Sequence, residues 1–204
     1  MNTKDPSPQT TLVVLLGASE WPLLPGFQRS EAFANAAKEL SAYFLEPRQF
    51  GLPPENLLDR FNADKSADDL DAEIGQFLEQ RIEAMKATDY TAKDVLLYYV
   101  GHGGFVGYNS DFYLAIRRTR MNNPLSSGLQ MKSLAHTLTE SARYLRRIII
   151  LDCCFAAAAF SAFQAEPAQV ALEKTMDAFE VRHITKGFPS KGTTLLCSSV
   201  STPA

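Results

Sequence analysis

The sequence predicts an α/β fold with a mostly parallel central sheet, because short apolar runs alternate along the chain with segments of helical periodicity. These runs are continuously apolar, which is typical of parallel strands that are buried on both faces. No internal repeat is present, and 204 residues suit a single domain. We therefore expect an N-terminal tail at residues 1–10 and one folded domain at residues 11–204.

The first half of the chain predicts two strands and two helices. The first strand is expected at residues 11–17 (TLVVLLG), and the loop after it holds the single tryptophan, Trp21. Ser30 then caps a helix whose apolar face comprises Phe33, Ala36, Ala37, Leu40 and Phe44. A short strand is expected at residues 56–61. The next helix has the clearest pattern, since Ser66 caps it and acidic residues fill its first turn. Its apolar stripe comprises Leu70, Ile74, Phe77, Leu78, Ile82 and Met85.

The second half of the chain predicts three further strands. Residues 94–100 (DVLLYYV) form the third strand, which the glycines of residues 101–104 break. Residues 146–151 (RRIIIL) form the fourth, and residues 193–197 form the fifth. Strands and helices in this alternating order predict parallel pairing with right-handed crossovers.

The segments between these strands carry weaker signals. We expect a small strand or hairpin arm at residues 111–116 and a helix at residues 132–143. The alanine-rich segment after Cys154 is expected to turn helical. Residues 166–191 are polar and weakly periodic, which predicts a long, partly mobile surface segment.

Composition excludes several classes of function. The formal net charge is −3 and no block of five like charges occurs, which argues against binding to nucleic acid or to an anionic membrane through a basic patch. The apolar stretches are too short or too interrupted to span a membrane, and the polar start of the chain does not resemble a signal peptide. Three cysteines, two of them adjacent, make a poor disulfide framework and no CxxC metal site, so we expect a cytoplasmic protein.

Reactive residues follow two of the predicted strands. His102 lies among the glycines after the third strand, and Asp152, Cys153 and Cys154 follow the fourth. Ligands bind at the carboxyl ends of strands in open α/β sheets, so an imidazole and a thiol meet there if the two strands are neighbours. That pairing is what nucleophilic cysteine catalysis needs. The backbone N–H groups of Gly103 and Cys154 would form an oxyanion hole, and Cys154 would begin the next helix, whose dipole lowers the pKa of a thiol.

Each of these residues also has a plainer explanation. A cysteine pair after an apolar strand is most often buried in the core, and a lone histidine in a glycine-rich turn is most often structural. Asp152 alone can serve as a helix cap. The two strand ends together favour catalysis, and the separation of His102 from Cys154 matches the caspase-type spacing of about 50 residues.

Three segments resemble those of caspase-like cysteine proteases (peptidase C14), most closely the bacterial, metacaspase-like branch of the caspase clan. They are LLYYVGHG at residues 96–103, IIILDCCF at 148–155 and TLLCSS at 194–199. The resemblance implies a caspase–haemoglobinase fold with three layers, α/β/α. It also implies a His102/Cys154 dyad that hydrolyses peptide bonds without a metal or cofactor, while Cys153 points into the core.

The resemblance also implies a substrate preference. In metacaspase-like proteases the Asp two positions before the nucleophile lines the S1 pocket, and Asp152 matches it. A carboxylate in this pocket attracts a cation and repels an aspartate, so we expect cleavage after Arg or Lys. Glu20 is a weak candidate for a second acidic contributor to S1, and Glu31 is another.

The chain departs from the family pattern in several places. Val100 replaces a frequent serine before Gly-His-Gly, and alanines follow Phe155 where the family usually has a small polar residue and a glycine. Only Asp111 represents the acidic cluster that binds calcium in some metacaspases, so we expect no calcium dependence. The family fold normally continues past the fifth strand, so we expect its C-terminal part to be missing from this sequence.

Members of this family are commonly activated by a cut between the nucleophile and the fifth strand. Four basic residues lie in this segment and are candidate self-cleavage sites if S1 accepts basic residues: Lys174, Arg182, Lys186 and Lys191. The alternative is that they are solvated surface charges.

Other enzyme classes lack their motifs. The chain contains no GxSxG elbow, no GxGxxG or Walker motif, and no zinc-ligand spacing among His102, His136, His183 and the cysteines. The remaining alternative is a catalytically quiet caspase-like module for docking or signalling. We therefore predict a cysteine endopeptidase that acts on protein or peptide substrates and is a zymogen switched on by a partner or an additional domain. The resemblance suggests a role in stress response or anti-phage immunity.

Overall fold

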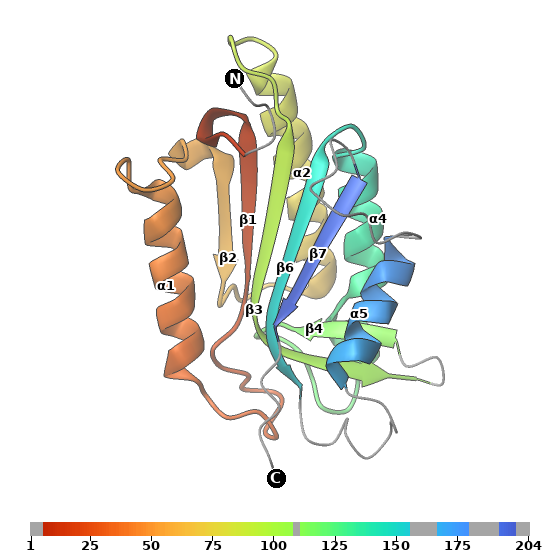
Figure 1. The fold of residues 1–204 in the computed structure, drawn as a ribbon. Helices are drawn as coiled ribbons and strands as arrows, with labels where there is room; N and C mark the ends of the chain where they lie inside the picture. The colour runs from red at the N-terminus through yellow and green to blue at the C-terminus, as the bar shows by residue number, and fades with distance from the viewer. Residues whose placement is uncertain (1–5, 108–110, 156–166, 180–191, 199–204) are drawn as a thin grey trace.

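The computed structural model describes residues 6–107, 111–155, 167–179 and 192–198, whose seven strands form one sheet with flanking helices (Figure 1). The parallel strands stand in the order β2, β1, β3, β6, β7, and β4 and β5 extend the sheet antiparallel from the end of β3. The predicted α/β fold with a mostly parallel sheet is confirmed. In chain order the elements are η1 (Pro8–Thr10), β1 (Thr11–Gly17), α1 (Glu31–Leu45), η2 (Pro54–Asn56), β2 (Leu57–Phe61), α2 (Ala67–Met85), β3 (Asp94–Val106), β4 (Asp111–Ala115), α3 (Pro124–Ser127), β5 (Leu129–Gln130), α4 (Met131–Ser141), β6 (Arg146–Phe155), α5 (Pro167–Ala178) and β7 (Gly192–Ser198).

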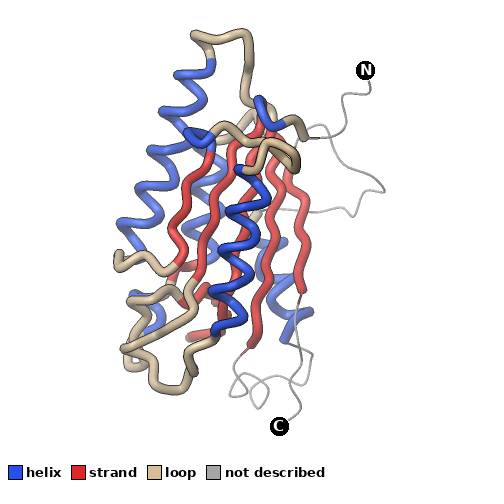
Figure 2. Tube along the Cα trace, turned by 90° about the vertical axis from the view of Figure 1, so that its left-hand side faces the viewer, coloured by secondary structure: helices blue, strands red, loops and turns tan. Residues whose placement is uncertain are grey.

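Helices cover both faces of the sheet, as the view from the α1 side shows (Figure 2). Alternate residues of a strand lie on opposite faces, and β1 is buried along its whole length. Val13 clusters with Phe44 of α1, and Leu15 clusters with Ala37 of the same helix. The alternate positions of β1 belong to a larger cluster with α2, α4 and α5 on the other face.

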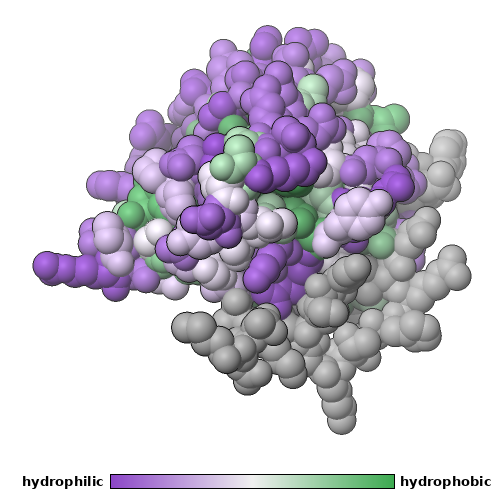
Figure 3. Space-filling view, turned by 90° about the horizontal axis from the view of Figure 1, so that it is seen from above, coloured by the Kyte–Doolittle hydropathy of each residue, from purple (hydrophilic) through white to green (hydrophobic). Residues whose placement is uncertain are grey.

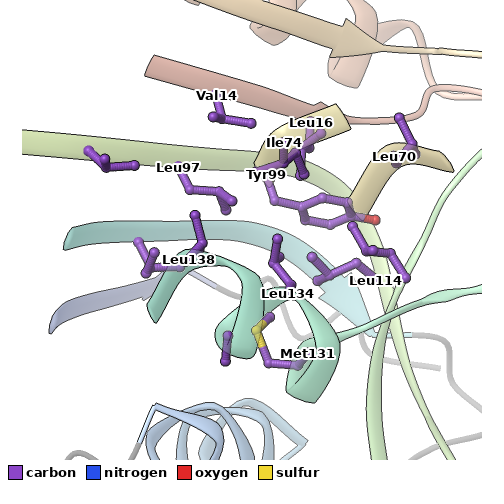
Figure 4. Packing of buried hydrophobic residues seen from close by; sticks show 14 of the residues in the cluster. Val14, Leu16, Leu70, Ile74, Leu97, Tyr99, Leu114, Met131, Leu134 and Leu138 are labelled. Carbon is purple, nitrogen blue, oxygen red and sulfur yellow. The ribbon is translucent and has the colours of Figure 1, made fainter. Parts of the chain in front are cut away.

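The larger cluster is the main core of the molecule (Figure 4). Tyr99 and Leu97 of β3 lie at its centre with no exposed surface, between the apolar stripes of α2 and α4. Those stripes contribute the fully or almost fully buried side chains of Leu70, Ile74, Leu78, Leu134 and Leu138. Burial of each such side chain contributes about 1.5–3 kcal/mol, so this cluster holds one face of the sheet against α2 and α4.

The predicted helix caps differ in what they do. The hydroxyl of Ser66 accepts a hydrogen bond of 3.1 Å from the backbone N–H of Asp69 and so caps α2 as predicted. Ser30 occupies the same position before α1, but its side chain makes no capping hydrogen bond. The expectation for α1 is therefore correct for the boundary and wrong for the cap.

Two strands run further than the sequence predicts. The glycines of residues 101–104 do not break β3, because its second half is paired with β4 on one side and with β6 on the other. Gly104 serves a close approach within the strand, since an added Cβ would lie 2.5 Å from the hydroxyl of Tyr113. Similarly, β6 continues to Phe155, so Cys154 lies inside a strand and does not begin a helix. The expectation that a helix dipole acts on Cys154 is therefore wrong, and the alanine-rich segment that follows lies outside the described residues.

The segment expected to be partly mobile contains a helix. Residues 167–178 form α5, which buries Val170, Ala171 and Thr175 against α4, β4 and β7. The hydroxyl of Thr175 donates to the carbonyl of Ala171 at 2.7 Å within the helix. The helical periodicity of this segment is weak because its apolar stripe is very short and has a polar threonine at its centre.

The register between β3 and β6 begins at a buried ion pair. Asp94 and Arg146 are paired at the start of the two strands, and the Nε of Arg146 donates to the Oδ1 of Asp94 at 2.5 Å. The two side chains are only 4% and 7% exposed. Breaking such a pair in the interior is costly, so it strongly disfavours any other alignment of these strands.

Seen from above, at the end of the sheet where the parallel strands begin, the surface is mostly hydrophilic, with small apolar areas between polar side chains (Figure 3). A surface cavity of about 470 Å³ lies between the end of α2 and the turn after α4, lined among others by Lys86, Arg143 and Tyr144. No helix among the described residues is both long enough and apolar enough to cross a membrane.

Candidate functional site

The structure brings His102 and Cys154 to adjacent positions. They are register partners in the parallel strands β3 and β6, near the carboxyl ends of both. Neighbouring strands lie about 4.8 Å apart, so the two backbones are within the reach of a side-chain contact. The expectation that these two strands are neighbours is confirmed.

Asp152 lies two residues before Cys154 in β6, at an alternate position of the same strand. Two residues of a strand span about 6.6 Å, which places Asp152 next to the His102–Cys154 pair. The hydroxyl of Tyr98, from β3, lies 3.5 Å from the Oδ2 of Asp152 at the limit of a hydrogen bond. Burial raises the pKa of Tyr98, and the negative charge of Asp152 raises it further. The Tyr98 hydroxyl therefore stays protonated beside this carboxylate.

Three aromatic rings surround the imidazole of His102. The ring centroid of Phe27 lies 4.5 Å from that of His102 in a tilted arrangement, and the centroid of Trp21 lies 4.6 Å away. Phe33 of α1 meets the imidazole edge-on at 5.2 Å. The same rings contact each other, since Trp21 packs edge-to-face against both phenylalanines. We call these three residues the aromatic cage.

The backbone carbonyl of Ala115 joins the strands that carry this site. Ala115 of β4 is the register partner of His102, and its carbonyl accepts a hydrogen bond of 2.8 Å from the Nε1 of Trp21. The buried hydroxyl of Tyr99 lies 3.0 Å from the same carbonyl and 2.5 Å from the carbonyl of His102. Burial raises the pKa of Tyr99 well above its usual value, so the hydroxyl remains a donor. These contacts connect the loop after β1, through Ala115 of β4 and the hydroxyl of Tyr99, to the backbone of His102.

No known protein family model matches this chain, and no curated protein matches it.

The other predicted site residues are placed as follows. Gly103 is buried in β3 between Leu114 of β4 and Phe155 of β6, and its role in an oxyanion hole stays a prediction. Cys153 is 2% exposed within the main core, as expected. Cys154 takes the next position of β6, and successive positions of a strand alternate between the two faces of the sheet.

The weaker candidates for acidic S1 residues are engaged in ion pairs. The carboxylate of Glu20, in the loop after β1, lies 2.8 Å from the guanidinium of Arg117 in the loop after β4. Glu31 pairs with Arg29 at 2.7 Å on an exposed surface. Their charges are compensated locally, which leaves Asp152 as the stronger candidate of the three.

The self-cleavage candidates fall in different places. Lys174 lies within α5, and a helix is less accessible to a protease than an exposed loop. Arg182, Lys186 and Lys191 lie outside the described residues. Self-cleavage in this segment stays a prediction.

The described residues contain no cluster of three or more His, Cys, Asp or Glu side chains that could hold a metal ion. His136 is exposed on α4. Lys132, on the same helix, pairs with Asp111, the one acidic residue that the sequence offered as a trace of a calcium site.

The aromatic cage is the part of the site that the sequence did not predict. Trp21 and Phe27 lie in a proline-containing loop far from His102 in the chain, and Phe33 was expected only as a core residue of a helix. The available signal was weak: a loop that follows a strand and carries large aromatic residues has to bury them near the strand end.

Proposed function

We propose that this chain is a caspase-like cysteine endopeptidase in which His102 and Cys154 form the catalytic dyad. One observation carries the proposal: the two residues are register partners at the carboxyl ends of neighbouring parallel strands. Ligands bind at such strand ends in open α/β sheets, so the pair is where a substrate can reach it. A fold of the caspase–haemoglobinase type, with α1 as one outer layer and α2, α4 and α5 as the other, is part of the proposal.

The chemistry follows from the two side chains. His102 takes the thiol proton of Cys154, and the thiolate attacks the carbonyl carbon of the scissile peptide bond. The imidazolium then donates that proton to the leaving amine, the C–N bond breaks, and a thioester remains on Cys154. His102 deprotonates a water molecule, whose attack releases the carboxylic acid and restores the thiol. The N–H groups of Gly103 and Cys154 stabilise the oxyanion of each tetrahedral intermediate.

Asp152 selects a basic residue at P1. Its carboxylate shares the site end of β6 with Cys154 and lies beside the polar hydroxyl of Tyr98. Val100, the register partner of Asp152, replaces the serine that is frequent in the family, and the Tyr98 hydroxyl supplies a polar group close to this position. The planar guanidinium of arginine can contact a carboxylate with two parallel hydrogen bonds, so we expect Arg to be preferred over Lys.

The proposal places the enzyme in the cytoplasm as a zymogen switched on by a partner or a further domain. The cytoplasmic location rests on the three cysteines of the chain, two of them adjacent, which make a poor disulfide framework. The switch and the suggested role in stress response or immunity rest on the resemblance of the strand-end motifs.

The test is hydrolysis of fluorogenic peptides that differ only at P1, with Arg, Lys, Asp or Leu. We expect cleavage after Arg and Lys, and none by Cys154→Ala or His102→Gln. The Asp152→Asn variant should lose about 10–150-fold in kcat/KM for the Arg peptide, as expected for a hydrogen-bonded charge pair worth about 1.5–3 kcal/mol. Asp89→Asn is the matched control, because it removes an exposed carboxylate from the turn after α2.

Labelling with an electrophilic Arg peptide covers the case of a zymogen that does not turn over substrate. A live dyad labels Cys154, and Cys153→Ala should label equally well because Cys153 is buried in the core. Cleavage after Asp would contradict the role of Asp152 in selecting a basic P1 residue but would still support the proposed protease activity. Silence in both assays would favour the alternative of a catalytically quiet docking or signalling module.

A further inference from the structure

We infer that Trp21 is a positioning residue for His102, acting through the aromatic cage and the carbonyl of Ala115. The inference rests on the proposed function, because it assigns a task to Trp21 within the proposed dyad. It goes beyond that function by adding a residue from the loop after β1 to the machinery of the site.

The first support is the packing around the imidazole. The centroids of three aromatic rings lie 4.5–5.2 Å from that of His102, and they come from the loop after β1 and from α1. Trp21 is only 3% exposed and contacts the other two rings of the cage as well as the imidazole. Packing against three rings restricts the rotation of the imidazole about its side-chain bonds.

The second support is the anchor of Trp21 itself. Its indole N–H donates a hydrogen bond of 2.8 Å to the carbonyl of Ala115, the residue paired with His102 across β3 and β4. The Tyr99 hydroxyl contacts that carbonyl and the His102 carbonyl. The ring that contacts the imidazole and the backbone that carries it are therefore held by one set of buried hydrogen bonds. Such connected supports fix a side chain more closely than packing alone.

The functional consequence concerns proton transfer. His102 must accept a proton from one atom and deliver it to another, and both steps need the ring nitrogen aligned within a fraction of an ångström. An unrestrained imidazole would spend much of its time in other orientations. Loss of the restraint should therefore lower kcat and leave the binding of the P1 side chain, which Asp152 provides, almost unchanged.

The first experiment uses Trp21 as its own reporter and does not depend on catalysis. Trp21 is the only tryptophan of the chain, and a protonated imidazole in ring contact quenches indole emission more strongly than a neutral one. In the Cys154→Ala protein, emission should change stepwise over the range in which histidines titrate. The step should vanish in Cys154→Ala/His102→Gln and persist in Cys154→Ala/His136→Gln, since His136 is exposed on α4.

The second experiment measures hydrolysis of the Arg peptide. Trp21→Leu should lower kcat about 10–100-fold, with KM within about threefold of the wild type, as a displaced catalytic group does. Trp21→Phe keeps a ring and loses the hydrogen bond to Ala115, so its kcat should lie between those of Trp21→Leu and the wild type. Phe44→Leu is the matched control, because it removes a buried ring from the same face of the sheet at the other end of α1.

The outcomes separate this inference from the proposed function. Absence of the His102-dependent emission step would overturn the contact on which the inference rests, whatever the enzyme does. A kcat of Trp21→Leu equal to that of Phe44→Leu would overturn the positioning role while the protease stands. A wild type that neither cleaves nor labels would refute the proposed function, and the positioning role with it. A cooperative thermal unfolding transition shows that a variant is folded. If Trp21→Leu does not fold, the comparison of kcat is made with Trp21→Phe.

Discussion

The register of β3 against β6 gives the sharpest prediction about stability, because the Asp94–Arg146 pair at its start is almost fully buried. Asp94→Asn keeps the shape of the side chain and removes its charge, which leaves the buried guanidinium of Arg146 without this carboxylate. Removing one partner of a buried pair costs about 3–5 kcal/mol, out of a total of about 5–15 kcal/mol for a typical domain. For a chain of this size, that loss corresponds to a fall in Tm of roughly 6–20 °C.

Urea unfolding followed by circular dichroism measures the effect, with Glu140→Gln as the control. Glu140 pairs with Arg143 on the surface of α4, where both side chains are more than half exposed, so its loss should cost little. Exchanging the charges, in Asp94→Arg/Arg146→Asp, should recover part of the stability that either single change loses. Equal unfolding midpoints for Asp94→Asn and Glu140→Gln would refute the argument that this pair is buried and holds the register.

Two further predictions concern α2 and its contacts. Ser66→Ala should cost about 1 kcal/mol and lower Tm by roughly 2–4 °C in calorimetry, whereas Ser30→Ala should leave Tm unchanged because Ser30 makes no capping bond. The pKa of Glu73 lies below its usual value of 4.5, chiefly because Arg60 donates a hydrogen bond to it at 2.6 Å. A carboxylate with a lowered pKa stabilises the fold above its usual pKa, and this contribution disappears as the pH falls through the lowered value. The wild type should therefore be more stable than Glu73→Gln to urea at pH 7, and this difference should shrink as the pH falls through the lowered pKa; a difference that does not change on acidification would contradict the ion pair.

The sequence predicted those elements whose hydrophobic pattern can be recognised within their own segment. The strands β1, β2 and β7 are short runs with apolar or β-branched residues, and α2 and α4 have regular apolar stripes, so each segment can be recognised from its own pattern. Their predicted bounds differ from the observed ones by two residues or fewer. Where local pattern and tertiary contact disagreed, contact decided: β3 crosses a glycine-rich stretch because two neighbouring strands pair with it there. The helix α5 was missed for the opposite reason, since its few buried positions surround a threonine.

The candidate site likewise has a part that the sequence predicted and a part that it did not. The sequence predicted that His102, Asp152 and Cys154 follow two strands of a parallel sheet, whereas the pairing of these two strands, β3 and β6, comes from the structure. Tyr98 beside Asp152 and Trp21 beside His102 depend on how side chains meet across the sheet and from a loop. No spacing in the chain encodes these contacts, so only the folded structure reveals them.

The separation of His102 and Cys154 acquires a physical meaning in this fold. Positions 102 and 154 are separated by the same 52 residues as Asp94 and Arg146, because both pairs belong to one register. A shift of one residue between the strands would move every side chain of β6 to the other face, separate the buried ion pair and bring Cys153 in place of Cys154 next to His102. An insertion in a loop between β3 and β6 would lengthen both separations equally. What the fold must preserve is the equality of the two separations, and the buried pair at one end of the strands enforces it at the other.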